Sequence, residues 1–202
     1  METLQQDEQA EIQEPVIEGQ VGEEEKINWR RFGLDILETL LLALILFFAI
    51  NAMSARVRVD GFSMRPTLED GEFVLVSKMS YLFGATQRGD IIVFHFPMDP
   101  KEELIKRVIG LPGDHVSVSA GIVYVNGQKI TEPYIAATPA YSGEWLVAEG
   151  QLFVLGDNRN NSNDSKDWGL LPAQNVVGKA VLIYWPPPLW DVIQHPQLIT
   201  SQ

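Results

Sequence analysis

A segment of 22 residues from Leu34 to Ala55, with an unbroken apolar run from Leu40 to Ile50, constrains this chain more than any other feature. At 1.5 Å per residue, a helix of this length measures about 33 Å, enough to span a hydrocarbon core about 30 Å thick. Its charged residues, Asp35 and Glu38, fall in the first two turns, where they can reach the interface. The sequence therefore predicts one transmembrane helix, with outer bounds at residues 32 and 55.

A cleaved signal peptide is the alternative interpretation of this segment. Small residues from Ala52 to Ala55 stand where a cleavage site would fall, but the long acidic leader is unlike the basic start of a signal peptide. We therefore favour a retained membrane anchor. The flanking basic residues are three before the segment and two after it: Lys26, Arg30, Arg31, Arg56 and Arg58. This small excess predicts a single-pass protein of the cell membrane with a cytoplasmic N-terminus and an extracytoplasmic remainder.

Negative charge is concentrated before the apolar segment. Of the formal net charge of -12, nine acids and one lysine between Met1 and Asn28 contribute -8, which leaves -4 for the rest. A segment this acidic, with few large apolar side chains, cannot bury enough apolar surface to offset the entropy lost on ordering. We therefore expect residues 1–31 to form a disordered cytoplasmic tail. The nearly balanced remainder offers no basic face, which excludes a nucleic-acid partner. The absence of cysteine excludes disulfides, thiolate metal sites and a cysteine nucleophile.

After Val57 the apolar residues form short runs rich in Val and Ile. The runs are Phe73 to Val76, Ile91 to Phe94, Leu104 to Ile109, Ile122 to Val125, Leu152 to Leu155 and Val176 to Tyr184. Runs of this kind, separated by turn residues, are typical of β-strands, and Ser119-Ala120-Gly121 predicts a tight hairpin. We expect a mainly β fold, in which an antiparallel β-sheet domain covers residues 56–186 and a C-terminal tail covers residues 187–202.

Ser63 is the first candidate for chemistry. It lies in a loop, Asp60 to Leu68, directly after the strand-like residues Arg56 to Val59 and eight residues beyond the apolar segment. A serine hydroxyl is a weak nucleophile without an activating base, so Ser63 taken alone is more simply an ordinary turn residue.

Lys106 is the second candidate, because it stands inside an apolar run from Leu104 to Ile109. Strand alternation puts Lys106 and Arg107 on opposite faces, so one of the two cations must point to the interior or to a groove. An edge strand protected by an inward charge would explain this arrangement. The functional alternative is a desolvated lysine, neutral near pH 7, that accepts a proton. Lowering its pKa from about 10.4 to about 7 would cost on the order of 4 to 5 kcal/mol.

The third candidate is a stretch of small polar and charged residues from Gly156 to Gly169. Such a stretch is commonly a solvated loop, and a calcium loop is the other structural interpretation. The calcium pattern fails because Arg159 occupies its third position, counted from Asp157, and no glycine stands at the sixth.

Four motifs in order carry a family resemblance: Ser63 to Leu68, Arg88 to Phe94, Lys106 to Asp114 and Gly156 to Arg159. From the membrane segment to about Trp185, the chain resembles bacterial type I signal peptidases, the membrane-bound Ser-Lys proteases of peptidase family S26. The resemblance implies that Ser63 is the nucleophile, Lys106 the general base, and Ser162 the hydroxyl that orients the lysine. It also implies the complex β fold of that family, with a catalytic domain outside the cytoplasm, no metal and no cofactor.

The resemblance also implies supporting and binding residues. Four residues of the third candidate stretch would hold the loop rather than perform chemistry: Asp157, Arg159, Asp164 and Lys166. The pocket walls would be Val59, Asp60, Met64, Leu68, Leu104 and Ile105. For Leu68 and Ile105, ordinary core packing is an equal alternative. The implied partners are signal-peptide-bearing preproteins, cut after a small-x-small (Ala-x-Ala) site, together with the lipid bilayer and a place near the export translocon.

Two positions depart from the family pattern. Some members carry a serine two residues before the nucleophile whose hydroxyl helps to bind the oxyanion, but here that position is Gly61. The backbone around Gly61, above all the N–H of Ser63, must then form the oxyanion hole. Lys166 stands where the family often has arginine, so its pairing with Asp164 loses bidentate geometry.

Other classes of function fit less of the sequence. A self-cleaving repressor-type Ser-Lys peptidase shares the chemistry but would have a DNA-binding domain in place of a membrane segment. A Ser-His-Asp hydrolase would use His95, His115 or His195, yet Ser63 lacks the G-x-S-x-G elbow. A catalytically inactive, membrane-anchored β module that binds extended peptides stays open until activity is measured.

Overall fold

A computed structural model describes residues 28–81, 84–196 and 198 of the 202-residue chain. Helix α1, Trp29–Met53, confirms the expected apolar helix, and its length and composition suffice to cross a membrane. It begins at Trp29 rather than at residue 32, so the last residues of the expected tail are helical. The rest of that tail, residues 1–27, lies outside the described residues.

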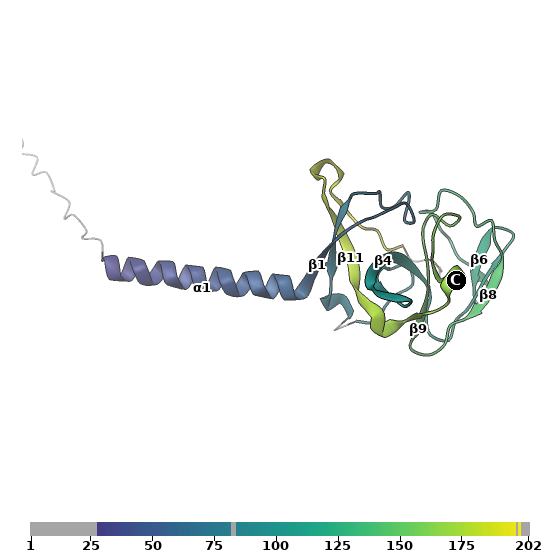
Figure 1. Cartoon of the computed structure of the whole chain (residues 1–202), viewed down its shortest axis with the longest axis horizontal. Coiled ribbons are helices and arrows are strands. Elements are labelled where there is room, and N and C mark those ends of the chain that lie inside the picture. The colour runs from purple at the N-terminus through teal and green to yellow at the C-terminus, as the bar shows by residue number, and fades with distance from the viewer. Residues whose placement is uncertain (1–27, 82–83, 197, 199–202) are drawn as a thin grey trace, which may run out of the picture. The chain divides into compact units, whose positions relative to one another are not determined.

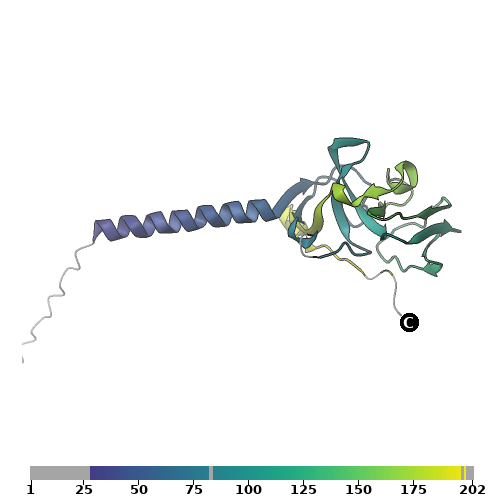
Figure 2. The ribbon, with the colours of Figure 1, turned by 90° about the horizontal axis from the view of Figure 1, so that it is seen from below.

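The expected antiparallel β fold is confirmed after the helix, where the strands of the described residues form two sheets with antiparallel pairings throughout. The large sheet comprises β1 (Ser54–Arg58), β2 (Phe73–Ser77), β3 (Ile91–Phe96), β4 (Asp99–Gly110), β9 (Gln151–Leu155), β10 (Leu171–Pro172), β11 (Val176–Trp185) and β12 (Asp191–Val192). The small sheet comprises β5 (His115–Ser119), β6 (Ile122–Val125), β7 (Gln128–Lys129) and β8 (Gly143–Leu146). Within the β domain, β6 and β8 lie at the end away from β1 (Figures 1 and 2).

Helical turns between the strands are short. They are η1 (Met79–Tyr81), α2 (Ser165–Trp168), η2 (Ala173–Asn175) and η3 (Pro187–Leu189). The predicted hairpin forms as β5 and β6, where Ala120 at φ 49° and Gly121 at φ 76° make the turn. Asp164 caps α2 by accepting a hydrogen bond from the Lys166 backbone N–H, and Asp167 completes a capping box.

Strand β4 is the central element for function because its inner half is buried on both faces. It pairs with β3 on one side and β9 on the other, and every residue from Ile105 to Gly110 is buried. Ile105 belongs to one apolar cluster, Val108 to a second and Ile109 to a third. Any polar side chain on this half of β4 is therefore removed from water.

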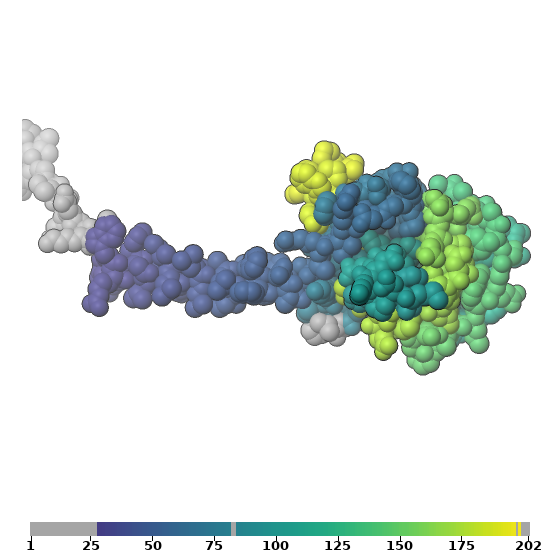
Figure 3. Space-filling model, viewed as in Figure 1, coloured from purple at the N-terminus to yellow at the C-terminus, as the bar shows by residue number. Residues whose placement is uncertain are grey.

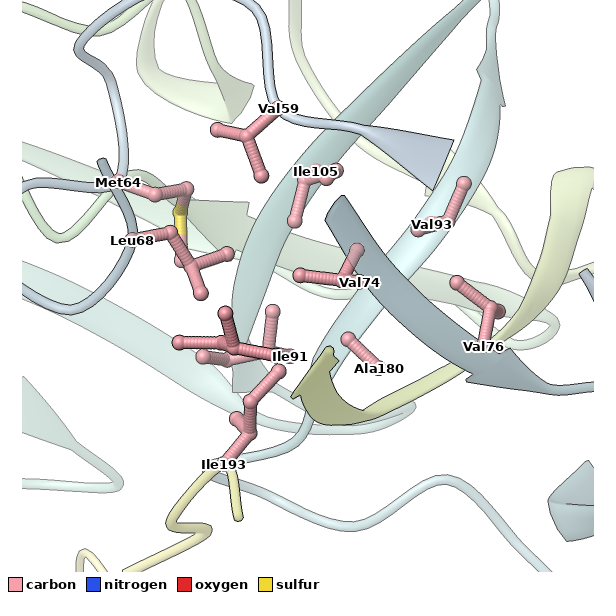
Figure 4. Packing of buried hydrophobic residues seen from close by; sticks show 11 residues of the cluster. Val59, Met64, Leu68, Val74, Val76, Ile91, Val93, Ile105, Ala180 and Ile193 are labelled. Atoms are coloured by element: carbon pink, nitrogen blue, oxygen red, sulfur yellow. The ribbon is translucent and has the colours of Figure 1, made fainter. Parts of the chain in front are cut away.

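The apolar cluster that contains Ile105 also fixes the loop between β1 and β2. Met64 and Leu68 from that loop point into the cluster beside Val74 of β2 and Ile91 of β3 (Figure 4). Both loop side chains are almost fully buried, at 1% and 0% exposed. The loop is thus held by hydrophobic contacts of the kind that stabilise strands.

The described part of the C-terminal segment is packed, whereas we expected residues 187–202 to form a tail. Asp191 and Val192 pair with β11 as β12, and Ile193 is buried in the same apolar cluster as Ile105. Leu198 is buried against the small sheet's cluster, and its carbonyl accepts a hydrogen bond of 2.9 Å from the Thr131 N–H. These apolar side chains explain why the segment packs onto the domain.

Candidate active site

The nucleophile candidate Ser63 lies in the β1–β2 loop, which the backbone closes at its base. The Val59 N–H donates to the Glu72 carbonyl at 2.7 Å, and the Gly71 N–H donates to the Val59 carbonyl at 2.9 Å. Within the loop, the Leu68 N–H donates to the Met64 carbonyl at 3.0 Å. These bonds and the two buried side chains leave Ser63 half-buried on a fixed turn.

Lys106 on β4 reaches Ser63 across 43 residues of sequence. Its Nζ lies 2.8 Å from Ser63 Oγ and 2.9 Å from the carbonyl oxygen of Ile105. The lysine is 3% exposed, and this burial lowers its pKa from 10.5 to about 8, with the Asp164 carboxylate acting in the opposite direction. The structure therefore brings together the predicted serine and lysine and supplies the desolvation that a general base requires.

Ser162, the third expected catalytic residue, lines the same cavity as Ser63 and Lys106. Its Oγ is buried, and among the described residues it has no hydrogen-bond partner, so the expected bond to Lys106 is absent from this conformation. Buried hydroxyls are almost always paired, which marks Ser162 as a group available to a further donor or acceptor.

Gly156 and Asn158, which follow β9, touch the nucleophile loop directly. The Asn158 N–H donates to the Ser63 carbonyl at 3.0 Å, and its Nδ2 donates to the Phe62 carbonyl at 3.1 Å. A Cβ at Gly156 would overlap the Ser63 carbonyl oxygen and the Ser162 hydroxyl. Only glycine permits this close approach. Both residues stood in a motif of the sequence, but nothing in the sequence indicated these contacts.

Asp157 links three parts of the site from a fully buried position. It accepts two hydrogen bonds from Arg107, at 2.8 Å from Nε and 2.6 Å from Nη2, and one of 2.5 Å from Thr67 Oγ1. Arg107 also donates to the Gly89 carbonyl at 2.8 Å. The expected supporting role of Asp157 thus has a definite partner, the arginine next to Lys106.

The other expected supporting residues also form contacts around the loop. Arg159 Nη2 lies 2.5 Å from Glu132 Oε1, and its Nε donates to the Gly156 carbonyl at 3.2 Å. Asp164 accepts from the Gly156 N–H at 2.9 Å, and Lys166 Nζ lies 3.4 Å from Asp164 Oδ1. Glu132 gave no signal in the sequence because it lies in a different connection, after β7.

The backbone near Gly61 bears on the oxyanion hole. The Gly61 N–H donates to Asp70 Oδ1 at 2.7 Å and is therefore occupied. Of the two positions expected to form the hole, this leaves the N–H of Ser63 as the donor for a developing oxyanion.

Two cavities meet at the serine and lysine. The first, of about 530 Å³, is lined by Ser63 and Lys106 and by five of the six expected pocket residues: Val59, Asp60, Met64, Leu104 and Ile105. The second, of about 580 Å³, is lined by Ser63, Lys106, Asp60, Gly61, Phe62, Glu102, Leu104, Asn160, Asn161, Ser162, Asn163, Lys166 and Asp167. Leu68 lines neither cavity, because it is fully buried in the apolar cluster of Figure 4. In Figure 3 the tip of the β3–β4 hairpin, in teal, adjoins the blue segment that follows β1.

The cavities contain no metal-binding arrangement. Within residues 28–81, 84–196 and 198, no group of three or more His, Asp or Glu side chains is placed to hold a metal ion.

Comparison with known proteins agrees with this arrangement. Residues 32–185 match the family described as signal peptidase, peptidase S26. A probable signal peptidase I-1 from Synechocystis sp. is 46% identical over 160 residues, covering 75% of this chain and 82% of the relative. Signal peptidase I of Leptolyngbya laminosa is 44% identical over 160 residues, covering 74% and 78%. A solved structure of a signal peptidase I from Enterococcus faecalis V583 covers 48% of this chain and 97% of its own, with 32% identity and a TM-score of 0.45.

A β domain that brings a serine to a buried lysine, in a chain with these relatives, defines a serine peptidase. The chain belongs to the signal peptidase family, peptidase S26. The identification of a bacterial type I signal peptidase from four short motifs is thereby confirmed.

Proposed function

We propose that this protein is a membrane-anchored endopeptidase that removes signal peptides from exported preproteins through a dyad of Ser63 and Lys106. The observation that carries the proposal is the distance of 2.8 Å between Lys106 Nζ and Ser63 Oγ, on a lysine that is almost fully buried. With a pKa of about 8, about a tenth of the lysine is neutral at pH 7. At the ordinary value of 10.5, only roughly one molecule in 3000 would be neutral.

The neutral amine of Lys106 accepts the hydroxyl proton of Ser63 while Oγ bonds to the scissile carbonyl carbon. The Ser63 N–H donates to the oxyanion that forms. The ammonium then gives its proton to the leaving nitrogen as the C–N bond breaks, which leaves an ester on Ser63. Water attacks this ester and passes a proton to Lys106, and Ser63 Oγ recovers that proton as the new carboxyl end departs.

The first cavity supports cleavage after small side chains. It lies between the chain at Arg56 to Asp60 and β4 at Lys101 to Lys106, so an extended peptide can add between two strand-like segments. Met64 and Ile105, which line it beside Ser63, are 1% and 8% exposed and offer a shallow apolar wall. Such a wall accepts alanine at the position before the scissile bond, in agreement with an Ala-x-Ala site.

The cleavage experiment uses the full chain in detergent with a purified preprotein that carries an Ala-x-Ala site. Wild type, Ser63→Ala, Lys106→Ala and the control Lys129→Ala are compared, and product masses are determined. Lys129 is an exposed lysine on β7 and lines neither cavity. We expect cutting after the Ala-x-Ala site by wild type and Lys129→Ala alone.

Two results would refute the proposed function. Wild-type-like cleavage by Lys106→Ala would exclude the dyad. The absence of cleavage by a folded wild type would instead favour an inactive, membrane-anchored module that binds extended peptides.

We also propose that α1 anchors the protein with a cytoplasmic N-terminus and an extracytoplasmic catalytic domain, near the export translocon. The lack of cysteine makes this directly testable with single-cysteine variants. In intact cells, a membrane-impermeant maleimide should label Lys129→Cys but not Gln9→Cys. The opposite labelling would overturn the orientation.

A further inference from the structure

The connection between β7 and β8 forms an extensive contact with the residues that carry the catalytic loop. We call Glu132 to Tyr141 the support segment and Gly156 to Asp164 the site loop. The support segment contains no strand or helix, and several of its residues contact the site loop or its neighbours. These contacts are Glu132 with Arg159, Tyr134 with Arg107 and Arg159, Thr138 and Ala140 with Asn160, and Tyr141 with Lys166.

Tyr134 is the centre of this contact. The Arg107 guanidinium carbon lies 3.9 Å from the centroid of its ring, and that of Arg159 lies 5.8 Å from it. The Tyr134 hydroxyl donates to Glu132 Oε1 at 3.0 Å and accepts from Arg159 Nη2 at 3.4 Å. One aromatic ring therefore contacts both buried guanidinium groups of the site through cation–π interactions and holds one of them by a hydrogen bond.

The two arginines beside Tyr134 both have a counter-charge only because the support segment supplies Glu132. The side chains of Arg107 and Arg159 are 1% and 0% exposed, and those of Asp157 and Glu132 are 0% and 7% exposed. Asp157 pairs with Arg107, so Arg159 depends on Glu132 for its counter-charge. Since a buried cation without a partner is strongly disfavoured, Glu132 and Tyr134 fix where Arg159 can lie.

Both arginines are connected to the reacting groups through residues that they contact. Arg107 is the neighbour of Lys106 on β4 and binds Asp157, which binds Thr67 of the nucleophile loop. Arg159 donates a hydrogen bond to the carbonyl of Gly156, the glycine that lies against the Ser63 carbonyl oxygen. On the surface, Asn160 is held by the Thr138 carbonyl at 3.0 Å and the Ala140 N–H at 2.7 Å.

We propose that Glu132 and Tyr134 are positioning residues that hold the site loop against the nucleophile loop, so that Ser63 and Lys106 meet in reactive geometry. This inference rests on the proposed function and extends it to a connection of the small sheet, outside the four sequence motifs. The support segment acts through Arg107 and Arg159, and none of its residues lines either cavity at Ser63. The small sheet is thus part of the catalytic framework.

The test compares Tyr134→Leu and Tyr134→Phe with the matched control Tyr124→Leu in detergent-solubilised full chain. Tyr124 is a half-buried tyrosine on β6 of the same small sheet. For Tyr134→Leu we expect kcat to fall about 10- to 100-fold with KM nearly unchanged, because misplaced reacting groups slow chemistry rather than binding. Tyr134→Phe keeps the ring and should stay within about threefold of wild type, and Tyr124→Leu should keep wild-type kcat.

Hydrogen exchange supplies a readout that does not depend on activity. Peptides covering residues 156–164 should exchange faster in Tyr134→Leu than in Tyr124→Leu at equal distance below each variant's melting temperature. If Tyr134→Leu does not fold, Glu132→Gln keeps the size of the side chain and removes its charge, and it should show the same two effects more weakly.

Either of two results would overturn the proposal. One is wild-type kcat and exchange in Tyr134→Leu or, where that variant does not fold, in Glu132→Gln, and the other is an equal loss in Tyr124→Leu, which would indicate general destabilisation. Failure of the proposed function is distinct, because then wild type itself does not cleave while the exchange comparison still decides whether the support segment holds the loop.

Discussion

Replacing Lys106 by methionine should stabilise the fold at neutral pH while abolishing activity. The buried amine has a pKa of about 8 instead of 10.5, so its charged form is disfavoured by about 3 kcal/mol, at about 1.36 kcal/mol per pKa unit. At pH 7 the folded protein must still protonate most of this lysine inside the apolar half of β4. Methionine has a similar length and carries no charge, so Lys106→Met removes this cost.

The stability difference between Lys106→Met and wild type should depend on pH. Between pH 8 and 10.5 the unfolded chain holds a proton on Lys106 that the folded protein has lost, so wild-type stability gains from rising pH in this window. Below pH 8 both states are protonated and the full cost remains. The stability advantage of Lys106→Met should therefore be largest at pH 7 and shrink by about 2 to 3 kcal/mol by pH 10.

Thermal or denaturant unfolding followed by tryptophan fluorescence, on both proteins in the same detergent at pH 7 and pH 10, measures this difference. Tyr81, Tyr134 and Tyr141 have raised pKa values through burial, and they affect both proteins equally, so their contribution cancels. A stability difference that stays constant between the two pH values, or widens, would refute the argument that burial lowers the pKa of Lys106.

Three further substitutions test the surroundings of the dyad. Gly156→Ala should lower kcat by about 100-fold, because the new methyl group overlaps the Ser63 carbonyl oxygen; Gly33→Ala, which meets nothing within 4 Å of its Cβ and lies in helix α1, is the control in the same cleavage assay. Asp157→Ala should destabilise the protein by about 3 to 5 kcal/mol in a melting experiment, because Arg107 is left buried without a counter-charge; an unchanged melting temperature would contradict this. Ser162→Ala should lower kcat by about tenfold or less and alter the pH-rate profile, since it removes one hydroxyl that can orient the amine; an unchanged profile would count against that role.

The parts of the fold that the sequence predicted are those set by local patterns. Ile122 to Val125 forms a strand with the expected bounds, and the expected run from Phe73 to Val76 differs from β2 by one residue. The apolar helix was likewise evident, because a long run of apolar residues can adopt few stable structures other than a membrane-spanning helix. Lys106 was a candidate because of its place in an apolar run, but its pairing with Ser63 came from the motifs, since no local pattern relates residues 43 positions apart.

What the sequence did not indicate depends on contacts between distant segments. For Leu68 the sequence left a pocket wall and core packing as equal alternatives, and only the course of the loop turns it into the core, where it is fully buried. The packing of Ile193 and Leu198 was missed because two apolar residues in a polar, proline-containing segment give no periodicity. The pairing of Glu132 with Arg159 joins two irregular connections, and no local rule fixes which charges meet there.

Lys106 and Arg107 are adjacent basic residues on β4, but their different surroundings give them different roles. The sequence required one of Lys106 and Arg107 to face the interior, and the structure buries both, on opposite faces. Arg107 meets Asp157 in a bidentate ion pair, which joins β4 to the loop after β9. Lys106 meets a serine hydroxyl and a backbone carbonyl, and no carboxylate of the described residues lies within ion-pair distance, so desolvation dominates and its pKa falls. A buried arginine is stable only beside a counter-charge such as Asp157. A buried lysine can act as a general base only without such a counter-charge, because an adjacent carboxylate would raise its pKa.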